Sequence, residues 1–332
     1  MYYNFVIIHA PVRGLKMEKI LHTSKAIQVL GLTTSKVFEN QLKELDTVGY
    51  TSFYYSRDEW LAKGIDIDYL AQKIDALLKE EGADGGKESN QYLTSGPERG
   101  RKAKKGERVE PNANRLSNLL NKDLSFLKLA MLSEILICSQ HVIGDEMRLS
   151  SLDMREPLKG CGNQELHTDV PDETKKIPTH QVQCVSFLYL DNSNEDSGPL
   201  RIIPASHRKP FHKKMMDDLK QPHVEEKFVI VPKGTLVIAN ASLWHSGTNK
   251  LNDDRRRVIF INYRNRKLRP QLNQRSFVSR SKIKLMNEAQ KYLLAVDEFS
   301  ITDGLKFWVY YNRNEWYVKL LLKMKQYLRK LI

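Results

Sequence analysis

Residues 235–263 read TLVIANASLWHSGTNKLNDDRRRVIFINY and contain two β-type runs joined by a polar turn. Branched and aromatic residues fill both runs, and the joining segment carries the Gly, Asn and Asp that are typical of turns. Four more short runs of the same kind lie upstream: MRLSSLDMR (147–155), QVQCVSFLYLD (181–191), LRIIPA (200–205) and KFVIV (227–231). Many short strands at close spacing favour a sandwich, barrel or jelly roll over a parallel sheet with crossover helices.

The N-terminal half is predicted to be largely helical. Residues 35–78 have apolar positions at helical spacing around LDTVGYTSFYY (45–55), where Gly49 indicates a turn into a strand. The stretch RLSNLLNKDLSFLKLAMLSEILICSQHVI (115–143) predicts one long helix that ends at Gly144. We therefore expect a mainly β protein with helical additions.

The domain organisation follows from shifts in composition along the 332 residues. Residues 1–34 are expected to form an N-terminal extension, and 35–311 a single catalytic domain. Residues 82–113 are polar and basic and predict a flexible insertion in that domain. Residues 312–332 are predicted to be a basic amphipathic helix, for which packing on protein is favoured over lying on a membrane surface.

Composition excludes several classes of protein. With 41% hydrophobic and 28% charged residues the chain is typical of a globular protein, and no apolar run approaches the roughly 20 residues of a membrane-spanning helix. The cysteines (Cys138, Cys161 and Cys184) lack metal-type spacing and predict reduced thiols in a cytoplasmic protein. A net charge of +13 raises the alternative of a nucleic-acid or membrane binder. Aromatic residues are not interleaved with the basic clusters as in single-strand binding grooves, so this alternative ranks last.

Candidate metal ligands occur in GNQELHTDV (162–170) and at the end of the run that contains His245. Residues two apart on a strand share a face, so His167 and Asp169 are expected to project together. His245 can supply a third ligand from a facing strand. Two His and one carboxylate on one side of a metal form the facial triad of non-haem Fe(II) oxygenases.

A cation for an anionic co-substrate follows His245 in the run RRRVIFINY. Arginine holds a carboxylate through two parallel hydrogen bonds. Alternation puts Arg256 on one face with Val258, and Arg255 and Arg257 on the other. Periodicity leaves open which face lines a pocket.

The segments REPLKGCGNQELHTDV (155–170), DSGPLRIIPASHRKP (196–210) and GTLVIANASLWHSGTNKLNDDRRRVIFINYR (234–264) resemble the phytanoyl-CoA dioxygenase family of Fe(II)- and 2-oxoglutarate-dependent oxygenases. The resemblance implies a double-stranded β-helix, a jelly-roll variant, with helices packed on its outside. It also implies that His167, Asp169 and His245 bind the metal and that Arg256, eleven residues after His245, binds 2-oxoglutarate.

The activity that the resemblance implies is oxidation of a small molecule. Fe(II), 2-oxoglutarate and O2 would take part, with ascorbate as an optional reductant, and succinate and CO2 would be released. Because Asp169 is present, hydroxylation is expected rather than halogenation. No nucleic-acid partner is expected.

Other readings stay open for individual residues and for the whole chain. Gln164 either reaches the co-substrate or caps the strand. His207 is expected to fix a loop by hydrogen bonds rather than act as a fourth ligand. The alternative for the chain is a cupin-like metal-binding protein or a metalloenzyme that does not use 2-oxoglutarate.

Overall fold

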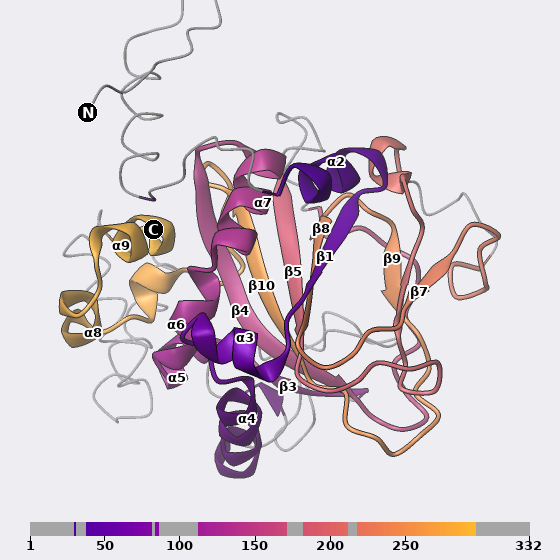
Figure 1. Ribbon diagram of the computed structural model, residues 1–332, viewed down its shortest axis with the longest axis horizontal. Helices are drawn as coiled ribbons and strands as arrows, with labels where there is room; N and C mark the ends of the chain where they lie inside the picture. The colour runs from indigo at the N-terminus through magenta and orange to yellow at the C-terminus, as the bar shows by residue number, and fades with distance from the viewer. Residues whose placement is uncertain are drawn as a thin grey trace, which may run out of the picture.

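The computed structural model of the protein describes residues 30, 38–81, 84–85, 112–170, 182–211 and 218–296. In that part of the chain, strands form a larger and a smaller sheet, and helices gather around the larger one (Figure 1). The predicted extension at 1–34 apart from residue 30, most of the 82–113 insertion and the helix predicted at 312–332 lie outside the described residues.

The larger sheet has seven strands in the order β1-β8-β5-β10-β4-β3-β2. Neighbouring strands are antiparallel except β2 and β3, which are parallel. The bounds of its strands are β1 (Tyr50–Tyr54), β2 (Asp84–Gly85), β3 (Ala113–Leu116), β4 (Met147–Pro157), β5 (Gln183–Tyr189), β8 (Thr235–Asn240) and β10 (Val258–Asn265).

The smaller sheet has the order β7-β6-β9 and is antiparallel, with β6 (Leu200–Ile202), β7 (Lys227–Val229) and β9 (His245–Gly247). An isolated antiparallel bridge joins His167 to His245 and so extends this sheet by one short segment. Two antiparallel sheets packed face to face in this strand order make the jelly roll that was predicted.

The inner faces of the two sheets share an apolar cluster. Val185, Phe187 and Val258 of the larger sheet meet Leu200 and Ile202 of the smaller one. The alternate residues of the same strands, among them Leu188 and Ile259, belong to a second apolar cluster on the outer face. Burial on both faces explains why every residue of β5 is buried, since this strand lies at the centre of the sheet.

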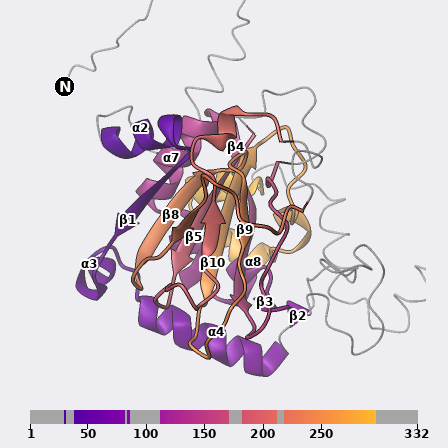
Figure 2. The same ribbon diagram turned by 90° about the vertical axis from the view of Figure 1, so that its right-hand side faces the viewer.

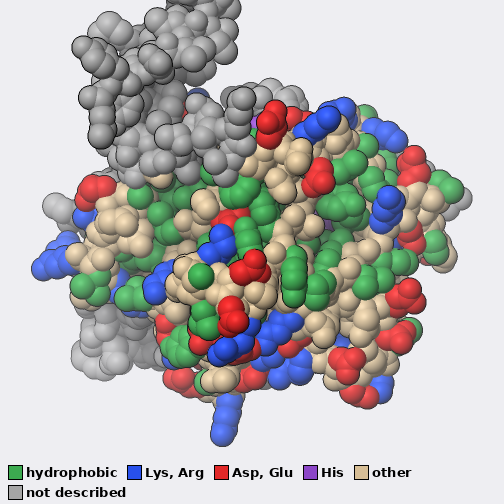
Figure 3. Space-filling model, in the orientation of Figure 1, with side chains coloured by type: hydrophobic (Ala, Val, Ile, Leu, Met, Phe, Trp, Pro, Cys, Tyr) green, Lys and Arg blue, Asp and Glu red, His purple; other side chains and the backbone are tan. Residues whose placement is uncertain are grey.

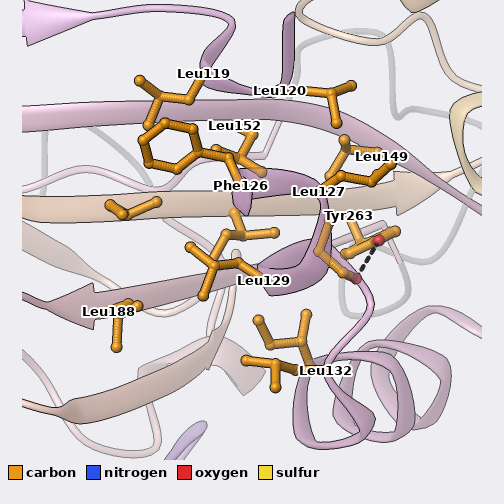
Figure 4. Packing of buried hydrophobic residues seen from close by; sticks show 14 of the residues in the cluster. Leu119, Leu120, Phe126, Leu127, Leu129, Leu132, Leu149, Leu152, Leu188 and Tyr263 are labelled. Carbon is orange, nitrogen blue, oxygen red and sulfur yellow. Dashed lines mark hydrogen bonds between the residues drawn. The ribbon is translucent and has the colours of Figure 1, made fainter. Parts of the chain in front are cut away.

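Helices cover the outer face of the larger sheet and one of its ends. In Figure 4, Phe126 and Leu129 pack against Leu152 and Leu188, and Tyr263 donates a hydrogen bond to the Ala130 carbonyl at 2.7 Å. Figure 2 shows α4 running beneath the ends of the central strands. The bounds are α2 (Glu39–Thr47), α3 (Arg57–Ala62), α4 (Ile67–Glu81), α5 (Leu119–Lys122), α6 (Ser125–Ala130), α7 (Ser133–Ile143), α8 (Arg280–Lys284) and α9 (Glu288–Leu294), with short 3-10 turns at Ser206–Arg208 and Gln274–Ser276.

The single long helix predicted over 115–143 is wrong. The segment begins in β3 and continues as α5, α6 and α7. Asn118 adopts a left-handed backbone with φ 58°, and Asp123 and Leu132 are extended, so the helix is interrupted at each point. The Asp123 carboxylate accepts the Ser125 amide at 2.9 Å, a local hydrogen bond that turns the chain just before α6.

The predicted turn at Gly49 is present between α2 and β1, with φ +88°. A Cβ at this position would lie 2.5 Å from His207 Nδ1, so a side chain is excluded on both counts. His207 Nε2 in turn lies 3.3 Å from the Asp46 carbonyl oxygen. His207 therefore fastens the loop that follows β6 to the end of α2, as expected from the sequence.

Charged side chains of both signs are interspersed on the face seen in Figure 3. Several form ion pairs, including Arg57 and Lys233 with the same carboxylate of Asp68. None of the described helices has the length and apolar character needed to cross a membrane.

Candidate metal centre and co-substrate pocket

His167, Asp169 and His245 converge on one point at the edge of the smaller sheet. One ligand atom from each lies within 4.8 Å of the other two. The His167 and His245 Nε2 atoms lie 3.8 and 3.5 Å from the Asp169 carboxylate oxygens, and the ring centroids are 4.5 Å apart. Two imidazole nitrogens and one carboxylate on the same side of a point are the donor set of a facial triad.

Backbone pairing sets this geometry. The His167 amide donates to the His245 carbonyl at 3.0 Å, and the His245 amide donates to the His167 carbonyl at 2.9 Å. The Asp169 amide donates to the Ala241 carbonyl at 2.9 Å. Main-chain hydrogen bonds therefore fix the backbone at each of the three candidate ligands.

Both imidazoles are also oriented by a second hydrogen bond. His167 Nδ1 lies 2.7 Å from the Glu165 carbonyl oxygen, and His245 Nδ1 lies 2.9 Å from that of Leu243. A carbonyl only accepts, so each Nδ1 carries the proton and donates it. The lone pair of each Nε2 is then free to bind a metal.

Electrostatics favour a neutral His167 and an ionised Asp169. Burial and the nearby His245 lower the pKa of His167 to about 4. Burial alone would raise the pKa of Asp169, but His245, His167 and Arg155 together outweigh burial and the pKa is lowered. Burial lowers the pKa of His245, but Asp169 and the Leu243 carbonyl together raise it by more, so the net shift is upward. The positive charge of Arg155 is felt by all three groups and lowers their pKa values.

Arg256 lies two residues before β10, and alternation along the chain puts it on the same side as Val258. The next residue on its face, Val258, belongs to the inner apolar cluster. Its Nε atom is buried and has no hydrogen-bond partner among the described residues. Burial lowers the pKa of Arg256, as desolvation of a cation requires.

The two neighbouring arginines point the other way. Arg255 bonds Glu156 and lies 2.9 Å from Asp75, while Arg257 lies 2.7 Å from Asp191 and 2.9 Å from Asp75. Asp75 belongs to α4, so one carboxylate of this helix binds both outward guanidiniums. The expectation that these two arginines meet carboxylates of the protein is confirmed.

Gln164 fastens the metal-bearing segment to β9. The side-chain Oε1 of Gln164 accepts a hydrogen bond from the backbone amide of Gly247 at 3.1 Å. The backbone amide of Gln164 donates to the Gly247 carbonyl at 3.0 Å. These bonds favour the strand-capping alternative. Ser246, next to His245, accepts a hydrogen bond from Arg201 Nε at 2.8 Å.

Tyr189, at the end of β5, was missed in the sequence. It is fully buried, and its hydroxyl has no hydrogen-bond partner among the described residues. Burial raises the pKa of Tyr189 and the charge of Arg256 lowers it, so the two groups lie within electrostatic reach of each other. In the sequence, Tyr189 differs from the apolar residues around it only by its hydroxyl group. Its position near Arg256 follows from the pairing of Tyr189 with Val258, and this pairing is known only once the register of the sheet is known.

A separate cavity of about 570 Å³ opens outside the barrel. Charged residues line it, among them Asp75, Glu156, Lys250 and Arg255. None of the three candidate metal ligands contributes to its wall.

Comparisons with known proteins agree with this architecture. The family model for phytanoyl-CoA dioxygenase (PhyH) matches residues 69–258, more than half of the chain. HygX from Streptomyces hygroscopicus, in a crystal structure with nickel and 2-oxoglutarate bound, is similar with a TM-score of 0.50 and 16% identity, over 72% of this chain and 89% of HygX. SnoN, a non-heme alpha ketoglutarate dependent epimerase from nogalamycin biosynthesis, is similar with a TM-score of 0.51 and 17% identity, over 70% of this chain and 85% of SnoN. Likeness at these identities establishes the fold.

Proposed function

Because the chain belongs to the phytanoyl-CoA dioxygenase family, we propose that it is an Fe(II)- and 2-oxoglutarate-dependent oxygenase that hydroxylates a carbon of a small molecule. The observation that carries the proposal is the convergence of His167, Asp169 and His245 with their ligand atoms within 4.8 Å of one another. The inward Arg256 without a hydrogen-bond partner in the described chain supports it independently.

The donor set fits Fe(II). Two neutral imidazoles and a carboxylate would hold the metal on one side and leave the other side open for 2-oxoglutarate and O2. Bound iron would supply the redox chemistry by which R–H, O2 and 2-oxoglutarate give R–OH, succinate and CO2. Asp169 brings one negative charge to the site, and the carbonyls of Glu165 and Leu243 keep both imidazoles in the binding tautomer.

Arg256 suits the distal carboxylate of 2-oxoglutarate. A buried cation without an ion pair is costly, and an anionic ligand removes that cost. The apolar inner cluster, with Val185 and Phe187, suits the two methylene groups between the carboxylate and the oxo group.

The substrate is proposed to enter on the side of Arg155 and Phe260. The Arg155 guanidinium lies 5.6 Å from the centre of the Phe260 ring, and this ring meets Phe187 edge to face at 5.1 Å. Both residues lie on inward-facing positions, since Val258 pairs with Arg155 and the Phe260 ring packs on the inner cluster.

An anaerobic titration tests the proposal. Addition of Fe(II) and then 2-oxoglutarate to the protein should produce the visible metal-to-ligand charge-transfer band of the chelate. His167→Ala should abolish the band, and Arg256→Met should weaken 2-oxoglutarate binding while leaving metal binding intact. A wild-type protein that binds metal but never develops the band would instead support a metal-binding protein or an enzyme that does not use 2-oxoglutarate.

Gln164 is kept as a proposed co-substrate contact. Gln164→Ala separates its two roles, because loss of strand capping should weaken metal and 2-oxoglutarate binding together. Loss of a direct contact should weaken 2-oxoglutarate binding alone.

A further inference from the structure

Lys250 is a buried lysine without a partner in the described part of the chain. The residue is 5% exposed, and its ammonium group makes no hydrogen bond or ion pair with any described residue. Burial lowers the pKa of Lys250, as expected of a cation that is held away from water. Burying an ammonium group without a counter-ion is costly, and an anionic ligand removes that cost.

Lys250 borders the cavity of about 570 Å³ that opens outside the barrel. Leu78 of α4 and Leu158, the residue after β4, lie on the same wall. Cavities that bind small molecules usually have volumes of about 300–1,000 Å³. The buried amine therefore lies beside a space that is large enough for a ligand.

Two carboxylates on the wall are already engaged by the protein. Glu156 accepts hydrogen bonds from Arg255 at 3.1 Å and from Asn114 at 3.0 Å. The Asp75 carboxylate lies 2.9 Å from the same Arg255 guanidinium. These contacts neutralise the acidic groups, so they do not provide a free site for a cation.

A second lysine of the wall is held only loosely. Lys159 pairs with Asp253, the third carboxylate of the wall, and both side chains are more than half exposed. An exposed ion pair of this kind contributes about 0–1 kcal/mol, so its lysine can turn to a ligand at little cost. The cavity therefore offers one buried and one exchangeable ammonium group.

The type of cation indicates the type of anion. A guanidinium fits a carboxylate through two parallel hydrogen bonds, but Arg255 already uses its guanidinium for Glu156 and Asp75. A lysine ammonium group is a compact point charge that suits a phosphate group. Lys159 and Lys250 together favour a phosphate group over a carboxylate.

The cavity is distinct from the candidate co-substrate pocket. Arg255 lines the cavity, whereas Arg256, which alternation puts on the other side of the chain, does not. The Lys250 amide donates to the Cys161 carbonyl at 2.8 Å, so its backbone is fixed independently of a ligand.

We infer that this cavity is a second ligand site, which binds the phosphate group of a small molecule through Lys250, with Lys159 as the second cation. The inference goes beyond the proposed function and does not depend on it. It concerns binding alone and includes no chemical step.

Titration of the full, metal-free chain with inorganic phosphate, followed by calorimetry at constant ionic strength, tests the inference. Lys250→Met keeps the length of the aliphatic stem and removes the charge, so the dissociation constant of phosphate should rise about tenfold to a hundredfold. Lys267→Met is the matched control, because Lys267 is an exposed lysine that pairs with Glu146 at 3.1 Å. Its phosphate affinity should equal that of the wild type. Acetate should bind to the wild type more weakly than phosphate does.

A second measurement needs no variant and covers the case in which Lys250→Met fails to fold. Wild-type protein is treated with acetic anhydride, and the acetylation rate of each lysine is followed by mass spectrometry of its peptides. Phosphate should slow the acetylation of Lys250 and leave that of Lys267 unchanged. Equal rates at Lys250 with and without phosphate would overturn the inference.

Three calorimetric results would also overturn it: no phosphate binding by the wild type, equal phosphate affinities in Lys250→Met and wild type, or acetate binding as tightly as phosphate. Loss of phosphate affinity in Arg256→Met but not in Lys250→Met would place the anion inside the barrel and would contradict the inference too. None of these results affects the titration with Fe(II) and 2-oxoglutarate, so the proposed function is tested separately.

Discussion

His167 and His245 exchange both of their backbone hydrogen bonds, at 3.0 and 2.9 Å, across an antiparallel bridge. The separation of the two imidazoles is therefore set by main-chain pairing rather than by the side chains themselves. Since a substitution at either position keeps its amide and carbonyl, ligand removal should affect metal binding far more than folding.

His245→Ala should lower the affinity for Fe(II), or for Ni(II) as a stable substitute, by about a hundredfold or more, because one of three protein ligands is lost. The melting temperature of the metal-free protein should change little. Metal affinity by calorimetry and melting by circular dichroism measure the two effects. His141→Ala is the control, since His141 pairs with Asp46 at 2.8 Å near the surface. An unchanged metal affinity in His245→Ala would exclude this residue as a ligand.

Arg155→Gln should bind metal more tightly than the wild type. The positive charge of Arg155 reaches all three candidate ligands, and a divalent cation at the same point is repelled by it. We expect the affinity to rise about threefold to tenfold, and the gain to shrink as salt is added. Arg57→Gln, which removes a charge paired with Asp68 elsewhere, should leave metal affinity unchanged. Weaker metal binding in Arg155→Gln would contradict this account.

Asp75→Ala should weaken 2-oxoglutarate binding without a change at the metal. Asp75 binds the guanidiniums of Arg255 and Arg257, both at 2.9 Å, and so fixes the backbone on either side of Arg256. With this clamp lost, Arg256 is held less firmly, and the dissociation constant of 2-oxoglutarate should rise about threefold to tenfold. Asp253→Ala is the control, because Asp253 pairs with exposed Lys159 and not with Arg255 or Arg257. Equal affinities in the two variants would show that the clamp does not act on Arg256.

The sequence predicts the candidate metal centre but only part of the proposed co-substrate pocket. His167, Asp169 and His245 could be predicted because spacing along a strand and the end of a β-type run are local features. Arg256 could be separated from Arg255 and Arg257 only by the family resemblance, since alternation assigns faces but does not say which face is inside. Tyr189 depends on the register between β5 and β10, a long-range property that one sequence does not express. The sequence does not reveal the helix breaks at Asn118, Asp123 and Leu132, because the helical spacing of apolar residues continues through all three. Local side-chain hydrogen bonds and tertiary packing set the backbone conformation at these residues.

Glu134 should make stability depend on pH. It is buried at 1% exposure and accepts hydrogen bonds from Tyr55 and Lys63 at 2.6 Å and from Ser133 at 3.0 Å. Burial raises the pKa of Glu134, but these bonds outweigh burial and the net shift is downward from 4.5. A carboxyl whose pKa is lower in the folded state stabilises the protein above its unfolded pKa, and this contribution is lost as pH falls through the folded pKa.

Glu134→Gln should therefore lower the free energy of unfolding at neutral pH by about 2 kcal/mol, since a charge-assisted network becomes a neutral one. The difference from wild type should shrink as the pH falls below about 4.5, when the wild-type carboxyl also becomes neutral. Urea denaturation of both proteins at a series of pH values measures this difference. Glu195→Gln, at an exposed position between β5 and β6, is the control for a general effect of charge. A difference between Glu134→Gln and wild type that stays constant from neutral to acidic pH would mean that the ionised form of Glu134 is not what stabilises its contacts with Tyr55 and Lys63.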